Sequence, residues 1–230
     1  MFIAGLQKTS LLDFPSKIAT IVFTQGCNFR CGYCHNPELL DFNFQKEPFI
    51  NEDDFFSFLD KRKGKVDGVV ITGGEPCLNN DLENFISKIK GKGFLVKLDT
   101  NGTYPDKIKA LLEKNLLDYI AMDIKAPFEK YHKITGSLIN QEILKKSINL
   151  IMNSNIKYEF RTTVLKSQLS FEDFEKIGDL IKGSKLYFLQ KFEASKIYNE
   201  ALMNEVTYSD EEFTEIINML KEYVDNVYLR

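Results

Sequence analysis

The chain has 230 residues, of which 43% are hydrophobic and 27% charged, and its 30 basic and 33 acidic residues leave a formal net charge of −3. This length suits one α/β domain, since such domains often have about 200–250 residues. The near-neutral charge argues against bulk attraction to nucleic acid or to an anionic membrane. The apolar runs are too short to span a membrane, and the first residues lack a signal-peptide pattern. We therefore expect a cytoplasmic protein with no nucleic-acid and no membrane partner.

Short apolar runs alternate with segments of helical periodicity along the chain. The runs expected as strands are 19–23, 68–72, 94–98, 117–122, 157–164 and 185–189. The segments expected as helices are 51–62, 80–91, 105–115, 140–153, 170–182 and 208–221. This alternation predicts an α/β fold with parallel strands and crossover helices. A partial, open β/α barrel of about six β/α units fits the length better than a closed barrel of eight, and a doubly wound sheet is the alternative.

Polar residues gather at or just past the ends of the predicted strands. Because the C-terminal ends of parallel strands meet at one edge of a sheet, these residues are expected to line a single rim. They include Cys27, the segment 73–76, the segment 99–102, the segment 123–125 and Arg161. The candidate site is therefore placed at this rim.

Three of the four cysteines, Cys27, Cys31 and Cys34, fall within eight residues, and Cys77 lies apart. In a large chain with few cysteines, such a cluster indicates a metal centre rather than a disulfide scaffold. A zinc site would need His35 as the fourth ligand, and the adjacent residues 34 and 35 would both have to turn onto one ion. The alternative is a four-iron cluster held by three thiolates, with one iron left open for catalysis. Cys77 is interpreted as a passive buried side chain.

The spacing Cys27-x-x-x-Cys31-x-Tyr33-Cys34 resembles the signature of the radical S-adenosylmethionine superfamily. The wider stretch 25–38 is similar to the activases of glycyl-radical enzymes. Residues 5–15, which lead into that loop, resemble more narrowly the activating proteins of anaerobic ribonucleoside-triphosphate reductases. The resemblance covers roughly residues 5–192 and is weak beyond them. It implies one radical S-adenosylmethionine domain over 1–230, with a core at about 17–192 and a C-terminal extension, 193–230, of unassigned role.

The resemblance also implies the site residues. A 4Fe-4S cluster would be held by Cys27, Cys31 and Cys34. S-adenosyl-L-methionine would be bound by Gly73, Gly74, Glu75, Asp99, Thr100, Asp123, Lys125 and Arg161. A monovalent cation at Asp99 and Thr100 is an option. The residues alone also allow structural roles: a tight turn at 73–76, a solvated pair of Asp123 with Lys125, and an ion pair of Arg161 with a neighbouring acid.

The implied activity is that of an anaerobic radical oxidoreductase. In this family the reduced cluster cleaves S-adenosylmethionine, and the resulting 5′-deoxyadenosyl radical would take hydrogen from a backbone glycine of a partner glycyl-radical enzyme. The resemblance points to an anaerobic ribonucleoside-triphosphate reductase as that partner. Since three motif cysteines leave no second cluster, electrons would come from an external flavodoxin- or ferredoxin-like donor.

Two other functions stay open on the sequence. A single-cluster enzyme of this size could act on a small molecule, as 7-carboxy-7-deazaguanine synthases do, and a zinc-stabilised binding module would use the same thiols without catalysis. Two positions depart from the activases: Ser16 stands where they usually carry glycine, and 188–192 lacks the histidine of pyruvate formate-lyase activases. Gln190 is the candidate to replace that histidine.

Overall fold

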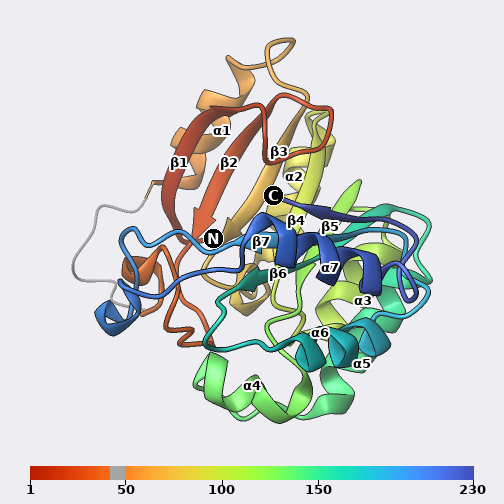
Figure 1. Cartoon of the computed structure of the whole chain (residues 1–230). Coiled ribbons are helices and arrows are strands. Elements are labelled where there is room, and N and C mark those ends of the chain that lie inside the picture. The colour runs from red at the N-terminus through yellow and green to blue at the C-terminus, as the bar shows by residue number, and fades with distance from the viewer. Residues whose placement is uncertain (42–49) are drawn as a thin grey trace.

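A computed structural model of the chain describes residues 1–41 and 50–230, and within them eight strands form one sheet in chain order (Figure 1). The strands are β1 (Ile3–Ser10), β2 (Ala19–Thr24), β3 (Gly68–Gly73), β4 (Leu95–Thr100), β5 (Tyr119–Asp123), β6 (Lys157–Val164), β7 (Tyr187–Lys191) and β8 (Val227–Leu229). The α-helices are α1 (Glu52–Asp60), α2 (Leu82–Gly91), α3 (Pro105–Glu113), α4 (Phe128–Thr135), α5 (Gln141–Met152), α6 (Phe171–Leu180) and α7 (Asp210–Leu220). Short 3₁₀ helices include Pro76–Leu78 and Glu200–Leu202.

The sheet is open, with β1 and β8 at its two edges, and this confirms the predicted α/β architecture. Strands β2 to β8 are parallel, whereas β1 pairs antiparallel with β2. The six predicted strands correspond to β2–β7. All six are parallel, as expected, and the additional strand β1 joins the edge antiparallel, because a hairpin partner can add to a parallel sheet without a crossover helix.

The helix boundaries follow from capping side chains. Asn51 accepts a hydrogen bond from the Asp53 amide and begins α1, and a reciprocal capping box between Ser209 and Glu212 begins α7. Gly136, with a φ of 67°, ends α4 in the left-handed conformation. In the described parts of the chain, no helix is both long and apolar enough to cross a membrane.

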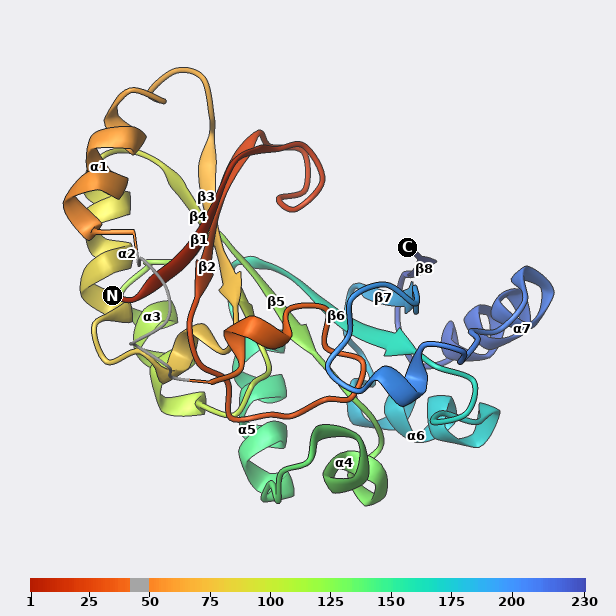
Figure 2. The same cartoon turned by 90° about the vertical axis from the view of Figure 1, so that its left-hand side faces the viewer.

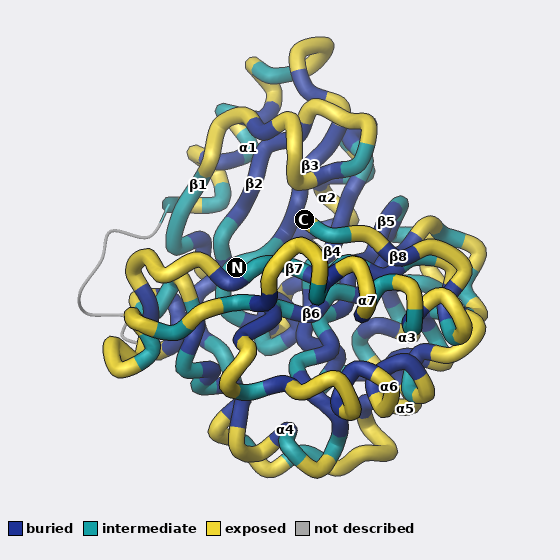
Figure 3. The backbone as a smooth tube through the Cα atoms, viewed as in Figure 1, coloured by how far each residue is buried: buried dark blue, intermediate teal, exposed yellow. Residues whose placement is uncertain are grey.

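Two apolar layers lie on the two faces of the sheet. The larger one packs the strands against the helices, which surround the outer face (Figure 2). The smaller one lies on the inner face and consists of Phe14, Ala19, Ile21, Val70 and Tyr119. The central strands are buried while the outward helix surfaces are exposed (Figure 3).

The inner face changes from apolar to charged along the strands. Tyr119 pairs in register with Lys97, and two residues further on each strand Ala121 pairs with Asp99. Asp123 then pairs with Arg161. Because side chains alternate between the two faces with a period of two, these ionisable side chains project to the inside, above the apolar layer. The fold thus places a charged layer directly beneath the rim.

Candidate functional site

A cavity of about 310 Å³ opens at the C-terminal ends of the strands. This size lies at the lower end of the range for small-molecule sites. All eleven residues predicted from the sequence line it: Cys27, Cys31, Cys34, Gly73, Gly74, Glu75, Asp99, Thr100, Asp123, Lys125 and Arg161. The fold therefore brings together the segments that the sequence places up to 134 residues apart. Gln190, the candidate to replace the missing histidine, also lines the cavity.

The loop that carries the cysteines is held to its surroundings by backbone hydrogen bonds. The amide of Gly26 donates to the Leu39 carbonyl over 2.8 Å, and that of Cys27 donates to the Leu40 carbonyl over 3.0 Å. The Arg30 guanidinium donates to the Cys27 carbonyl at 2.7 Å. These hydrogen bonds hold the backbone on both sides of Cys27 in place.

The three thiols are partly or fully buried beside the cavity. Burial raises the pKa of Cys27 to about 12 and that of Cys31 to about 11, and it raises the pKa of Cys34 as well. Such thiols are protonated at neutral pH unless a metal displaces the proton. The raised pKa values therefore argue against a free nucleophilic thiolate at this site.

The donor set fits a polynuclear cluster. Among residues 1–41 and 50–230, no three His, Cys, Asp or Glu side chains converge on a point where one ion could sit. A 4Fe-4S cluster does not need such convergence, because each thiolate binds a different iron. Tyr33 also lines the cavity, and its buried hydroxyl has no hydrogen-bond partner among the described residues.

The glycine pair at the end of β3 is required by a close approach of two backbones. Gly73 has a φ of 109°, and a Cβ atom on Gly74 would lie 2.0 Å from the Gly26 carbonyl oxygen. The Glu75 amide donates to that same carbonyl over 2.8 Å. The pair therefore forms a tight turn, as the structural interpretation of 73–76 required, and this turn also holds the cysteine loop.

The carboxylate of Glu75 is 1% exposed and joins the ends of β3 and β4. One oxygen accepts from the Cys77 amide at 3.0 Å and from the Thr100 hydroxyl at 2.8 Å. The other oxygen accepts from the Asn101 amide at 2.6 Å. Burial raises the pKa of Glu75, and these three donors oppose that shift. Cys77 is fully buried behind Glu75 and does not line the cavity, in agreement with a passive role.

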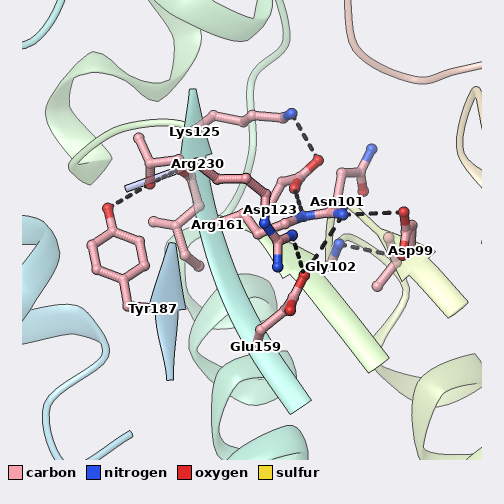
Figure 4. Close-up of polar contacts among 12 residues, drawn as sticks. Asp99, Asn101, Gly102, Asp123, Lys125, Glu159, Arg161, Tyr187 and Arg230 are labelled. Carbon is pink, nitrogen blue, oxygen red and sulfur yellow. Dashed lines mark hydrogen bonds and ion pairs between the residues drawn. The ribbon is translucent and has the colours of Figure 1, made fainter. Parts of the chain in front are cut away.

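A chain of ion pairs crosses the inner face beneath the rim (Figure 4). Arg161 donates from Nε to Asp123 over 2.8 Å and from Nη1 to Asp99 over 3.1 Å. Lys125 Nζ lies 2.9 Å from the other oxygen of Asp123. Burial would raise the pKa of Asp123, but Arg161 and Lys125 outweigh it and bring that pKa to about 2. Asp123 and Lys125 lie side by side, as the period of two predicted, and Arg161 has the acidic neighbours that the structural alternative required.

Sequence reasoning missed the ionisable residues deeper in this layer. Lys97 is 2% exposed and pairs with Asp99, and Glu159 is fully buried. The Glu159 carboxylate accepts from the Tyr119 hydroxyl at 2.8 Å and from Arg230 at 3.3 Å. A signal was present, because Lys97 and Glu159 each precede a recognised site residue by two positions on an apolar strand.

Two departures from the activases have a structural outcome. Ser16 has a φ of 61°, a left-handed conformation in which glycine would be unstrained. His35 makes an edge-on contact with the Phe192 ring, with centroids 6.3 Å apart. The chain thus keeps the turn at residue 16 without glycine, and the histidine next to Cys34 packs against the residue that directly follows β7, the strand that carries Gln190.

The comparisons with known proteins agree with this geometry. The family described as "Radical SAM superfamily" matches residues 21–181. A Methanocaldococcus jannaschii protein, named provisionally as a glycyl-radical enzyme activating enzyme, is 36% identical over 99% of this chain and 95% of its own length. The 7-carboxy-7-deazaguanine synthase of Aquifex aeolicus is 37% identical over 84% of this chain and 79% of its own length.

Among solved structures, Streptococcus suis SuiB bound to S-adenosylmethionine superposes with a TM-score of 0.67 at 15% identity. The match covers 91% of this chain and 49% of that one, and at this identity it speaks for the fold. The family match, the full-length relative and the three-cysteine loop at the rim lead to one assignment. The chain is an enzyme of the radical S-adenosylmethionine superfamily.

Proposed function

We propose that this enzyme is an activase that generates a glycyl radical on a partner protein, and that the partner is an anaerobic ribonucleoside-triphosphate reductase. The observation that carries the activase assignment is the match to the Methanocaldococcus jannaschii relative, which extends over 99% of this chain and 95% of that protein. The choice of reductase rests on the resemblance of residues 5–15.

In this proposal Cys27, Cys31 and Cys34 hold a 4Fe-4S cluster, and S-adenosylmethionine occupies the rest of the cavity. When bound, the two groups supply a 5′-deoxyadenosyl radical that removes a hydrogen atom from the substrate. The chain's own part is to bind and orient them. Lys125 and Arg161 supply positive charge toward a ligand carboxylate, Asp99 and Asp123 hold those cations in place, and the Gly73–Gly74 turn keeps the cysteine loop against β3.

Exposed apolar side chains beside the cysteine loop support a protein substrate. Leu138 is 85% exposed, and its neighbour Ser137 donates to the Asn28 carbonyl of that loop. Tyr198 is 48% exposed, and its amide donates to the Cys34 carbonyl. Apolar groups exposed beside the cysteine loop suit the docking of a protein surface. The reducing electron would come from a flavodoxin- or ferredoxin-like protein.

A second candidate is a radical enzyme that acts on a small molecule, and the 37% identity to the 7-carboxy-7-deazaguanine synthase supports it. Both candidates use the same cluster and the same S-adenosylmethionine, so the cavity alone does not separate them. They differ in the origin of the hydrogen atom that ends in 5′-deoxyadenosine.

The deciding experiment follows that hydrogen atom. Anaerobically reconstituted enzyme is reduced with dithionite in the presence of S-adenosylmethionine and of a reductase subunit labelled with α-deuterated glycine. The activase assignment expects one deuterium in 5′-deoxyadenosine and a glycyl radical signal in the electron paramagnetic resonance spectrum. A parallel reaction contains the small-molecule substrate of a 7-carboxy-7-deazaguanine synthase. Deuterium-free product with the subunit, together with turnover of that small molecule, would reject the activase and support the alternative.

A further inference from the structure

The carboxylates of Asp99 and Asp123 have no free oxygen. Lys97 Nζ lies 2.5 Å from one oxygen of Asp99, and Arg161 Nη1 lies 3.1 Å from the other. Arg161 Nε lies 2.8 Å from one oxygen of Asp123, and Lys125 Nζ lies 2.9 Å from the other. Each of the four oxygens therefore already has a cationic partner that belongs to the chain. Figure 4 shows the contacts of Arg161 and Lys125 among them.

The Thr100 hydroxyl is also engaged, on the opposite side of its strand. It donates to Glu75 at 2.8 Å and accepts from the Gly102 amide at 3.1 Å. Neighbouring residues of a strand project to opposite faces, and the hydrogen bonds of the Thr100 hydroxyl lie on the side of Glu75, away from the cations that contact Asp99. The pair expected from the sequence to hold a monovalent cation is thus divided between two faces of β4.

The net charge of the ion-paired group also argues against an added cation. Three cationic side chains, Lys97, Arg161 and Lys125, face two carboxylates, so this group carries a net charge of +1. The nearby Glu159 has its own partner in Arg230 at 3.3 Å. An alkali ion would have to displace a tethered ammonium or guanidinium group from a buried oxygen, against like-charge repulsion.

We propose that Lys97 and Arg161 occupy the place of a monovalent metal ion, so that this enzyme binds S-adenosylmethionine without an added alkali cation. Lys97 acts as a positioning residue: it holds Asp99 against Arg161, and Arg161 in turn holds Asp123 beside Lys125. The inference rests on S-adenosylmethionine binding at this rim. It does not depend on whether the radical then attacks a protein or a small molecule.

The wild-type enzyme provides the first test. S-adenosylmethionine is titrated by calorimetry into the anaerobically reconstituted enzyme in potassium, sodium or tetramethylammonium chloride of equal ionic strength. Tetramethylammonium is too bulky to replace an alkali ion among carboxylates. The expected dissociation constants agree within about twofold, which is less than 0.5 kcal/mol. Binding that is about tenfold tighter in potassium or sodium would overturn the proposal.

The Lys97→Met variant provides the second test, because it frees one oxygen of Asp99 and opens a space at a buried negative charge. We expect this variant to bind S-adenosylmethionine about tenfold more weakly in tetramethylammonium chloride. Potassium, sodium or methylammonium should restore much of that loss. Binding by the variant that equals the wild type in tetramethylammonium chloride would show that Lys97 has no positioning role.

A third measurement does not involve S-adenosylmethionine, so its result is independent of the proposed function. The thermal midpoint of the full chain without cluster is followed in the same three salts. The wild-type midpoint should be the same in all of them, and that of Lys97→Met should be lower and should rise selectively with potassium or sodium. A selective rise in the wild type would contradict the proposal. Lys90→Met is the matched control, since it breaks a half-buried pair with Asp118 remote from the cavity and should show no cation selectivity.

Discussion

Because Gly74 has no side chain, the backbone that follows β3 can lie against the Gly26 carbonyl of the cysteine loop. A Cβ atom at residue 74 would lie 2.0 Å from that backbone oxygen, and no side-chain rotation can relieve the clash, because the backbone fixes the position of a Cβ atom. The Gly74→Ala variant should therefore displace the cysteine loop and lose about 1–3 kcal/mol of unfolding free energy. It should also retain less iron after reconstitution, measured per chain by a chelator assay.

The control for this variant is Gly91→Ala, at the end of α2, where no heavy atom lies within 4 Å of a new Cβ. That substitution should leave iron content unchanged and stability equal or slightly higher. Full iron content in Gly74→Ala would mean that the cysteine loop does not depend on its contact with β3.

The ion pairs of Asp123 predict how stability depends on pH. Its pKa falls from 3.8 to about 2 on folding, so the folded state binds fewer protons than the unfolded state in this range. The stabilisation is complete above about pH 4 and is lost as the pH falls toward about 2, a change of about 2 kcal/mol. Urea unfolding of the cluster-free chain should show this loss, and Asp123→Asn should be less stable at neutral pH with a flatter profile. Asp106→Asn, in an exposed pair with Lys146, is the control and should keep the wild-type profile.

At the scale of elements, the sequence predicted the parts of the fold whose pattern is local. Strands β2–β7 are short apolar runs buried on both faces, and the helices that cover them carry a clear amphipathic period. The edge strands β1 and β8 were not predicted, because their formation depends on pairing with a neighbouring strand. Residues 5–9 of β1 are partly or fully exposed and show no alternation, and β8 has three residues. Helix α4, which has eight residues and follows Pro127, was not among the helices expected from the periodicity.

The C-terminal extension contributes a segment that packs on the cysteine loop. The amide of Tyr198 donates to the Cys34 carbonyl over 3.0 Å, and the amide of Asn199 donates to the Gly32 carbonyl over 2.8 Å. Leu202 follows, and its Cδ1 would lie 2.9 Å from a Cβ atom on Gly32. The extension thus covers the loop from outside, which gives residues 198–202 a role that the sequence left unassigned.

Removal of this cover should make the metal more accessible. The Leu202→Ala variant keeps the backbone hydrogen bonds but opens a gap over Gly32, so iron should pass to an added chelator several times faster than in the wild type, measured anaerobically by absorbance. Met203→Ala changes a neighbouring side chain that is 40% exposed and should release iron at the wild-type rate. Equal rates in all three proteins would show that the segment does not protect the loop.

Across the whole molecule, the rim residues were predictable and the layer beneath them was not. Cys27, Asp123 and Arg161 stand in motifs whose spacing carries a resemblance, and parallel strands bring their ends to one edge. Lys97, Glu159 and Arg230 belong to no motif. Their partners are brought close by the way β4, β6 and β8 pair within the sheet. The register of that strand pairing cannot be read from the sequence.

Arg230 joins the open edge of the sheet to the inner face. Its backbone pairs with β7, its guanidinium lies 3.7 Å from the centre of the Phe188 ring, and its Nη1 lies 3.3 Å from Glu159 (Figure 4). Without Arg230, the nearest cation to Glu159 is Arg161 at 4.0 Å, which already serves two aspartates. The last strand therefore supplies the main counter-charge for a carboxylate deep in the sheet.

The Arg230→Met variant tests this link, because it leaves Glu159 buried with too little positive charge. We expect a loss of about 1–3 kcal/mol in unfolding free energy, less than for a fully buried pair because Arg230 is 42% exposed. Adding Glu159→Gln should recover most of the loss, since a neutral amide still accepts from the Tyr119 hydroxyl. Lys176→Met, in an exposed pair with Glu172 on α6, should change stability by less than about 0.5 kcal/mol. Additive effects of the two substitutions in urea unfolding would mean that Arg230 stabilises the edge through its ring contact alone and not through Glu159.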